Sequence, residues 1–233
     1  MKNNDIDILN KKHIDDFKRA IDIYEQNYKH EEIISLIQNG SIVEKQIAAL
    51  KLDSINSPKD AETFIQNLTG CDGKIREAVS FRLEEFVKKN PEYFEKYVDI
   101  FLEAIVDING NICRNTIGSL KYQNEMFKKE FCAKLLEKTL ILSKSARTFD
   151  IQDGKYKINK EIFKLYWYLE TVYELVEYIN SAQLVEIVNN TKEIFDYTIR
   201  EKTAKILCKI NDEKLNSIKQ KLKNDENYYV RRF

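Results

Sequence analysis

Proline and glycine are scarce in this chain of 233 residues, which contains two prolines and six glycines. An all-β protein needs many tight turns and usually uses more of both, so their scarcity argues against that class. No apolar run approaches the ~18 residues that a membrane-spanning helix requires, and we expect no membrane partner. The first residues, MKNNDIDILNKKH, are polar and acidic, which is not typical of a secretory signal.

Histidine and cysteine, common ligands of protein-bound metals, are also few. The chain has two histidines and four cysteines, with no CxxC pair and no cysteine at metal-ligand spacing from a histidine. We therefore expect no metal site, no disulfide framework and a reducing, cytoplasmic compartment. No catalytic signature is present, so the sequence predicts a non-enzymatic protein without a cofactor. The cysteines lie in or beside apolar helical patterns, which predicts small buried residues at Cys71, Cys113, Cys132 and Cys208.

An excess of one charge is missing as well, because 38 basic and 38 acidic side chains cancel. Neutrality argues against a wholly basic nucleic-acid binder but permits a local patch. Residues 121–164 hold eleven basic and six acidic side chains. This basic band is a candidate contact for nucleic acid or an acidic protein, and an ordinary solvated surface is the alternative.

The sequence does contain signals for helix starts and apolar residues at the spacing of helices. Both prolines follow a capping residue, in Ser57-Pro58 and Asn90-Pro91, which predicts a helix start at each place. Apolar residues recur three and four positions apart, and no segment alternates as a strand does. The pattern predicts an all-α protein, as in the run Ile75, Val79, Leu83 and Phe86.

A repeat organises these helices. Each of the first four copies starts with glycine or tyrosine, reaches an isoleucine two residues later and has a leucine ten residues after the start, and the sequence ends inside the fifth copy, YYVRRF. The starts lie 33, 37, 87 and 31 residues apart, so the longest gap spans two periods and predicts a degenerate unit around residues 160–179. The copies begin at Gly40, Gly73, Gly110, Tyr197 and Tyr228.

In three copies an aspartate in the turn is followed by Val/Ile-Arg within the second helix. These are Asp72 with Ile75-Arg76, Asp196 with Ile199-Arg200, and Asp225 with Val230-Arg231. Two helices per unit with this pattern resemble the HEAT-repeat family over roughly residues 31–233. The copies depart from the family pattern in two places, because Arg114 comes one position late and Val43-Glu44 stands where arginine is expected.

The resemblance implies a right-handed α-solenoid of about five to six helix pairs. It also implies that the aspartates cap the second helices and that the arginines pair with acids in a ladder. Residues 1–30 do not match the repeat and are expected to form a capping helix region. The segment 143–160 is expected to be a loop inserted into the array of residues 31–233.

One segment carries a binding hypothesis. Leu165, Leu169 and Val172 supply an apolar stripe, which leaves aromatic and acidic side chains on another side of the helix. The resemblance implies that second helices line a concave face, where aromatic rings and carboxylates can hold a cationic or peptide-like ligand. Core packing is the alternative. The candidate partner-binding residues are Tyr166, Trp167, Glu170, Tyr173, Glu174 and Arg114.

Two functions follow from the resemblance. The first is a non-enzymatic scaffold that binds a protein or peptide along its concave face. The alternative is a DNA-binding protein similar to the HEAT-like alkylpurine DNA glycosylases, which cradle a cationic base with tryptophans and a carboxylate. Trp167 has Glu170 and Glu174 nearby, but Thr171 stands where that family has an acid, and a second tryptophan is missing.

Overall fold

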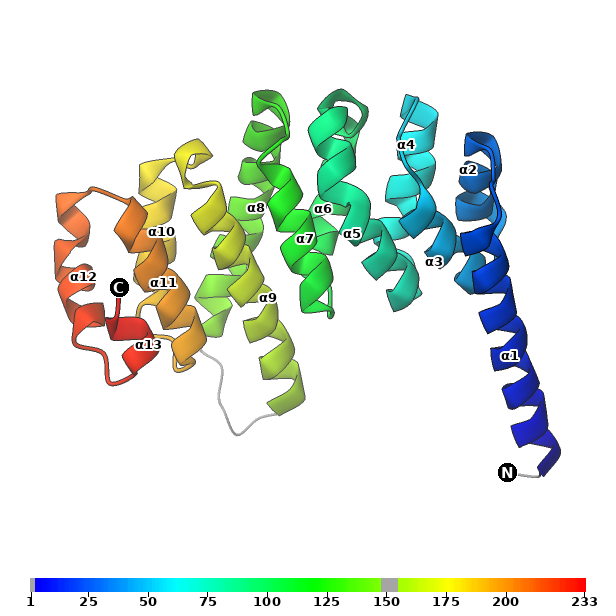
Figure 1. Cartoon of the computed structure of the whole chain (residues 1–233). Helices are drawn as coiled ribbons and strands as arrows, with labels where there is room; N and C mark the ends of the chain where they lie inside the picture. The colour runs from blue at the N-terminus through cyan, green and yellow to red at the C-terminus, as the bar shows by residue number, and fades with distance from the viewer. Residues whose placement is uncertain (1–2, 148–154) are drawn as a thin grey trace. The chain divides into compact units, whose positions relative to one another are not determined.

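The computed structural model describes residues 3–147 and 155–233, of which residues 3–10, 155–159 and 181 are described in their backbone only. Every regular element in this part of the chain is helical, so the prediction of an all-α protein is confirmed (Figure 1). None of the described helices is both long and apolar enough to cross a bilayer.

The chain forms two compact units whose sequences interleave. Unit 1 comprises Met1–Ile100 and Asn109–Gln123, and unit 2 comprises Phe101–Ile108 and Asn124–Phe233. One helix, α6 (Val98–Ala104), has residues in both units.

Unit 1 is built from helices that pack in the order of the chain. Helix α1 packs on α3, α2 packs on α3 and α4, and α3, α5 and α7 follow one another as a row. Phe64 of α4 meets Phe86 of α5 edge to face, with ring centroids 5.1 Å apart. The helices are α1 (Asn3–Glu25), α2 (His30–Asn39), α3 (Ile42–Lys51), α4 (Pro58–Ile65), α5 (Gly73–Lys89) and α7 (Gly110–Leu120).

Unit 2 repeats this style of packing. Helix α8 packs on α9 and α10, and α9, α11 and α13 form a row. Its core includes Phe127, which stacks on Phe131 at 5.7 Å and meets Phe101 edge to face at 5.3 Å. The helices are α8 (Glu125–Ala146), α9 (Lys155–Glu174), α10 (Ser181–Thr191), α11 (Tyr197–Lys209), α12 (Asn216–Lys223) and α13 (Tyr228–Arg231).

Short 3-10 segments complete the chain. One of them corrects a predicted helix start, because Pro91 opens a 3-10 turn and α6 begins only at Val98. The turn ends at Phe94 and a second 3-10 segment follows it, so the run expected to be one helix is divided. The 3-10 segments are Gln66–Leu68, Pro91–Tyr93, Glu95–Tyr97, Val176–Tyr178 and Glu213–Leu215.

Polar side chains cap several of the other helix starts. Ser57 accepts a hydrogen bond from the Asp60 backbone N–H, as the Ser57-Pro58 signal predicts. Asp72 accepts from the backbone N–H groups of Lys74 and Ile75, and Asp196 caps α11 in the same way. These caps satisfy N–H groups that have no partner inside the helix. The expected capping by these two aspartates is confirmed. The expected capping by Asp225 is wrong, because Asn227 caps α13 and Asp225 instead accepts from the Asn227 backbone N–H.

Two sequence expectations need correction. The predicted loop at 143–160 is shorter, because α8 continues to Ala146 and α9 begins at Lys155, and the stretch 148–154 lies outside the described residues. Cys71 and Cys208 are exposed, whereas Cys113 and Cys132 are buried as expected. The apolar pattern misleads for Cys71 because it lies in the turn before α5, and for Cys208 because it faces outward near the end of α11.

Candidate functional site

The predicted carboxylate Glu170 is engaged by lysines of the same chain. Lys202 of α11 donates to the Glu170 Oε2 atom at 2.6 Å, and Lys205 approaches Oε1 at 3.2 Å. The Lys202 side chain is 8% exposed and that of Glu170 is 20% exposed. This triad holds the α9–α11 contact with charge as well as apolar packing.

Tyrosine rings flank the triad on the same face of α9. The ammonium group of Lys202 lies 4.4 Å from the ring centroid of Tyr166. Lys205 and Lys209 lie 4.3 Å and 3.8 Å from the ring centroid of Tyr173. Ring faces attract cations, so each of these contacts is favourable. The aromatic and acidic side chains of α9 thus hold cations supplied by α11.

The electrostatics of the pair favour its charged form. Burial alone would raise the pKa of Glu170, but hydrogen bonds and charge from Lys202 and Lys205 outweigh it and lower that pKa. Burial likewise disfavours the charged form of Lys202, but its bonds to Glu170 and Tyr166 raise the Lys202 pKa overall. Both partners therefore remain ionised near neutral pH.

Trp167 lies in the core beside this face. It is 7% exposed and contacts Phe163 and Tyr166 edge to face, at centroid distances of 6.1 Å and 5.2 Å. Its indole N–H is buried and has no hydrogen-bond partner among the described residues. The packing alternative therefore describes the position of Trp167 in this structure.

The remaining predicted residues lie apart from the triad. Glu174 is exposed near the end of α9. Arg114 is exposed on α7 in unit 1, where it donates to Asn111 at 3.1 Å. Of the six predicted residues, Tyr166, Glu170 and Tyr173 are thus the three that contact the lysines of α11.

Sequence reasoning missed the lysines of α11. Lys202, Lys205 and Lys209 follow one another at spacings of three and four, which places them on one side of a helix. That spacing was visible in the sequence, but nothing in it showed that the lysines would face α9.

An exposed row of aromatics and arginines continues from α11 to α13. Tyr197 stacks on Tyr229 at 6.1 Å, and Tyr228 meets Tyr229 edge to face. The guanidinium groups of Arg231 and Arg232 lie 5.8 Å and 5.3 Å from the rings of Tyr228 and Tyr229. All three tyrosines are at least 40% exposed. The sequence indicated part of this row, because tyrosine stands at the start of the last two copies of the repeat, where the earlier copies have glycine.

Arg200 forms the most complete ion pair of unit 2. Its Nε and Nη2 atoms donate to the two carboxylate oxygens of Asp225, at 2.7 Å and 3.1 Å. The side chains are 11% and 10% exposed. The hydrogen bonds from Arg200 lower the pKa of Asp225 despite the opposing effect of burial. Asp225 belongs to the next turn of the repeat, so the expected pairing of an arginine with an adjacent acid is confirmed here.

The repeat arginines also share a return contact. Each stands at the fourth position of a second helix and donates from its Nη1 atom to carbonyl groups five or six residues earlier. This contact ties the helix to the turn before it, and it assigns the arginines a structural role. The bonds are Arg76 to Gly70 at 2.8 Å, Arg200 to Ile194 at 2.9 Å and Phe195 at 2.8 Å, and Arg231 to Asp225 at 3.3 Å and Glu226 at 2.6 Å.

The basic band at 121–164 is largely compensated where it is described. Five of its lysines lie within 4.0 Å of a carboxylate, which reduces their attraction for phosphates. These pairs are Lys121–Glu84, Lys129–Glu125, Lys134–Glu130, Lys144–Glu186 and Lys164–Glu161.

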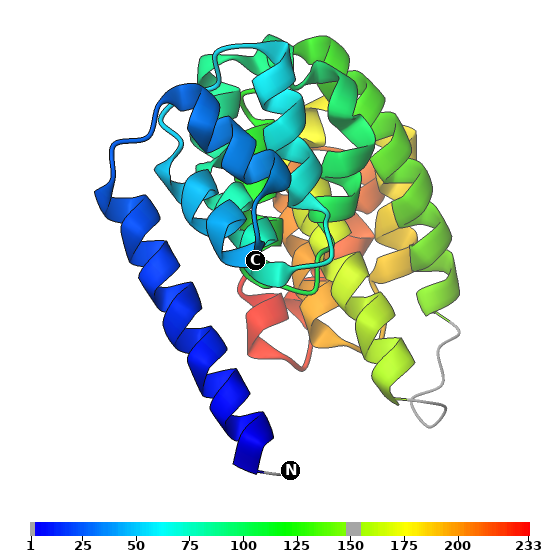
Figure 2. The same cartoon turned by 90° about the vertical axis from the view of Figure 1, so that its right-hand side faces the viewer.

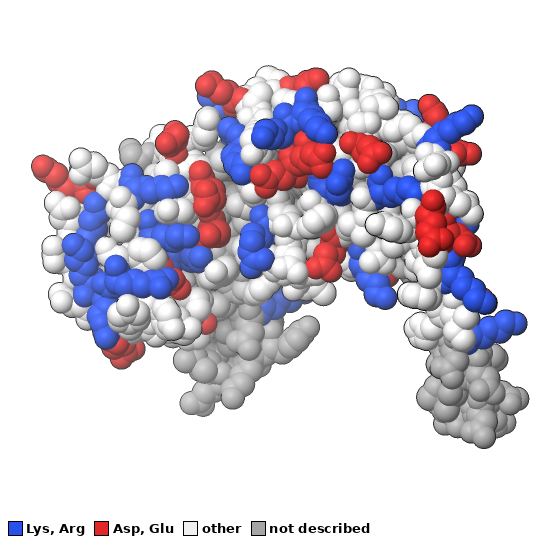
Figure 3. All heavy atoms as spheres, in the orientation of Figure 1, with Lys and Arg blue, Asp and Glu red and all other residues white. Residues whose placement is uncertain are grey.

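Positive charge instead gathers on the carboxyl-terminal helices of unit 2 (Figure 3). Residues 197–233 contain ten basic and five acidic side chains. Lys209, Arg231 and Arg232 are exposed there, beside the exposed tyrosines.

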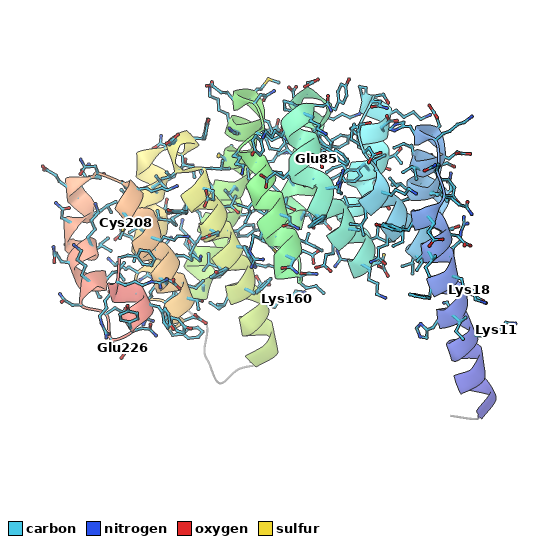
Figure 4. The ribbon with its side chains drawn as sticks, viewed as in Figure 1. Lys11, Lys18, Glu85, Lys160, Cys208 and Glu226 are labelled. Carbon is cyan, nitrogen blue, oxygen red and sulfur yellow. The ribbon has the colours of Figure 1, made fainter. Side chains whose placement is uncertain are left out.

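Two open cavities lie away from the predicted residues. The first, about 240 Å³, is in unit 2 and is lined by Ala204, Leu207, Cys208, Lys219, Leu222, Lys223 and Phe233. The second, about 330 Å³, is in unit 1 and is lined by Gly40, Ile42, Lys45, Asn67, Gly70, Cys71, Asp72 and Ile75. Figure 4 labels Cys208 near the carboxyl end of α11.

Within the described residues, no three side chains of His, Cys, Asp or Glu come together in a way that could hold a metal ion. Comparison with protein-family models, with curated proteins and with solved structures finds no significant match for this chain.

Proposed function

We propose that this chain is a HEAT-like right-handed α-solenoid of five to six helix pairs that acts as a non-enzymatic interaction module. Two observations support the architecture. Second helices follow one another as a row within each unit, α3–α5–α7 in one and α9–α11–α13 in the other. The return contact of the arginine at the fourth helical position recurs at Arg76, Arg200 and Arg231. Stacked pairs of this kind offer extended surfaces to partners.

The partner in this proposal is an acidic peptide segment of another protein, bound over α11 and α13. The observation that supports an acidic rather than a cationic ligand is that Glu170 already forms ion pairs with Lys202 and Lys205. An unoccupied site formed by aromatic rings and a carboxylate would attract a cationic ligand. The site on α9, however, is already occupied by lysines of the same chain. Residues 197–233 nevertheless keep a surplus of positive charge, and that surplus attracts an acidic ligand.

The exposed side chains fit a protein partner better than nucleic acid. Tyrosine and arginine are enriched among residues that dominate protein–protein binding energy. The surplus of five positive charges in residues 197–233 is modest, whereas nucleic-acid interfaces carry strongly basic surfaces. Tyr228, Tyr229 and Arg232 would supply the anchors, with Arg232 exchanging its ion pair with Glu201, at 2.7 Å, for a carboxylate of the ligand. Lys209, which donates to the Tyr173 carbonyl group at 3.0 Å and keeps its charge, would supply long-range attraction.

Fluorescence anisotropy tests the proposal with a short fluorescein-labelled peptide in which glutamate alternates with leucine and phenylalanine. We expect the double variant Lys209→Glu/Arg232→Glu to weaken binding at least about tenfold, or about 1.4 kcal/mol. The matched control is Lys129→Glu, which reverses a lysine on α8 that is 71% exposed, and it should bind as the wild type does. Circular dichroism checks that each variant is folded.

Three results contradict the proposal. They are equal binding by the double variant and the control, equal binding of a lysine-containing version of the peptide, and tighter binding of a single-stranded DNA oligonucleotide. The last result would favour the nucleic-acid alternative.

A further inference from the structure

Over residues 11–25, where its side chains are described, helix α1 packs one side against α3 and leaves an apolar stripe exposed on the opposite side. Ile23 is fully buried where α1 packs on α3. Arg19 on the same side pairs with Glu44 of α3 at 2.8 Å. Lys51 at the end of α3 donates to the carbonyl groups of Ile23 and Tyr24, at 2.7 Å and 2.8 Å. These contacts anchor the carboxyl-terminal half of α1 to unit 1.

The opposite face exposes four large apolar side chains. Ile14, Phe17, Ile21 and Tyr24 are 54%, 68%, 37% and 76% exposed. Their spacing of three, four and three residues is that of the seam in a two-helix coiled coil. In two perpendicular views, the amino-terminal half of α1 extends beyond the other helices of unit 1 (Figure 1, Figure 2). The exposed fractions of its four side chains leave the stripe accessible to another helix.

Charges beside the stripe select the orientation of that helix. On a helical projection, Lys11 and Lys18 flank one edge toward the amino-terminal end of the stripe, and Asp22 and Glu25 flank the same edge toward its carboxyl-terminal end. All four are exposed, and Figure 4 labels the two lysines on α1. The charge along this edge thus changes from positive to negative toward the carboxyl end of the helix. The edge is therefore complementary to the same edge of a second α1 helix that runs antiparallel to it.

We propose that two copies of this chain associate through their α1 helices, packed antiparallel about a two-fold axis. In this register Ile14 meets Tyr24 of the second copy, and Phe17 meets Ile21. Lys11 then lies beside Glu25 of the second copy on both sides of the axis. The two Lys18 side chains approach each other near the axis, each within one turn of Asp22 of the second copy.

The size of the stripe sets the expected strength. Two aromatic and two aliphatic side chains, partly exposed, amount to roughly 400 Å² per copy, about half the area of a standard interface on each partner. We therefore expect a reversible dimer with a dissociation constant of about 10–100 µM. The proposal does not depend on the function proposed for unit 2.

Sedimentation equilibrium of the full chain, at several concentrations around that range and with a reducing agent, tests the dimer. We expect Phe17→Glu to weaken association more than about tenfold. Phe81→Glu is the matched control, because Phe81 is 69% exposed on α5, and it should leave association unchanged. A chain that is monomeric at every concentration, or a dimer that survives Phe17→Glu, overturns the proposal.

Charge reversal tests the antiparallel register independently. We expect Lys11→Glu and Glu25→Lys each to weaken the dimer several-fold, and the double variant to restore it. In a parallel pair these positions lie about 21 Å apart along the helix, so the double variant would not recover. Failure of the double variant to recover, in a chain that dimerises, overturns the antiparallel arrangement. Both substitutions are at exposed positions, so folding should be unaffected, and circular dichroism verifies this.

Discussion

Lys202 of α11 and Glu170 of α9 meet at 2.6 Å, although the lysine side chain is only 8% exposed. A buried ammonium group needs a compensating charge, and Glu170 provides it. The charge of this buried lysine is therefore balanced by a single carboxylate.

Replacing that carboxylate should destabilise the fold. We expect Glu170→Gln to lower the free energy of unfolding by about 1–3 kcal/mol, because Lys202 would keep its charge in a buried place without a counter-ion. Urea unfolding at neutral pH measures the loss. Glu174→Gln on the exposed part of α9 is the control and should change stability by less than about 0.5 kcal/mol. Equal stability of the two variants would contradict the role assigned to the pair.

The same pair predicts a dependence on pH. The pKa of Glu170 is lowered in the folded protein from an ordinary value of 4.5. A lowered carboxyl pKa stabilises the fold above the unfolded-state pKa, and the stabilisation is lost as pH falls through the folded-state pKa. The stability difference between wild type and Glu170→Gln should therefore be constant from neutral pH to about pH 5.5 and shrink below about pH 4.5. A gap that widens with acidification would contradict this assignment.

Arg200 should not tolerate lysine. Its guanidinium group donates to both oxygens of Asp225 and to two backbone carbonyls, a geometry that one ammonium group cannot reproduce. We expect Arg200→Lys to cost about 1–3 kcal/mol in thermal or urea unfolding. Arg231→Lys, at an exposed position, should cost less than about 1 kcal/mol. If both variants lose the same stability, the buried pair contributes nothing specific.

Gly40 and Gly70 should respond differently to alanine. A Cβ atom at Gly40 would lie 2.5 Å from the Leu36 carbonyl oxygen and 2.8 Å from the Glu44 Cβ, whereas one at Gly70 would meet nothing within 4 Å. Backbone cannot move away cheaply, so Gly40→Ala should cost about 1–3 kcal/mol and Gly70→Ala should be tolerated. Thermal unfolding of the two variants measures the difference in stability. Equal melting curves would contradict this prediction and show that the turn at Gly40 can relax.

The cysteines should separate into two classes. Cys71 and Cys208 are exposed, and burial raises the pKa of Cys132 to about 12. Only the thiolate reacts with disulfide reagents, so two thiols should react quickly in the native protein and four in denaturant. Mass spectrometry of the labelled chain identifies them. Rapid native labelling of Cys113 or Cys132 would be inconsistent with this structure.

Local chemistry made the helices predictable. The capping signals at Ser57, Asp72 and Asp196 act over two or three residues, so they are legible in sequence. The three-and-four spacing of apolar residues likewise marks the buried side of each helix. Pro91 shows the limit, since the same signal began a 3-10 turn there and a second 3-10 segment after Phe94 divided the expected helix.

The candidate site was less predictable because it depends on neighbours distant in sequence. Glu170 and Lys202 are 32 residues apart, and only the packing of α9 on α11 makes them partners. From the sequence of α9 alone, its aromatic and acidic side chains therefore resembled an unoccupied binding site for a cation. Trp167 was ambiguous for a related reason, since a large ring beside acidic residues is equally typical of a site and of a core.

The interleaving of the two units has a practical consequence for dissecting the molecule. Because residues 101–108 belong to unit 2 and residues 109–123 return to unit 1, no single scission of the polypeptide separates the two units with both of them whole. Truncation series and split-protein fusions would each leave one half lacking part of its own interior, so point substitutions are the better tools for assigning roles to α1 and α11.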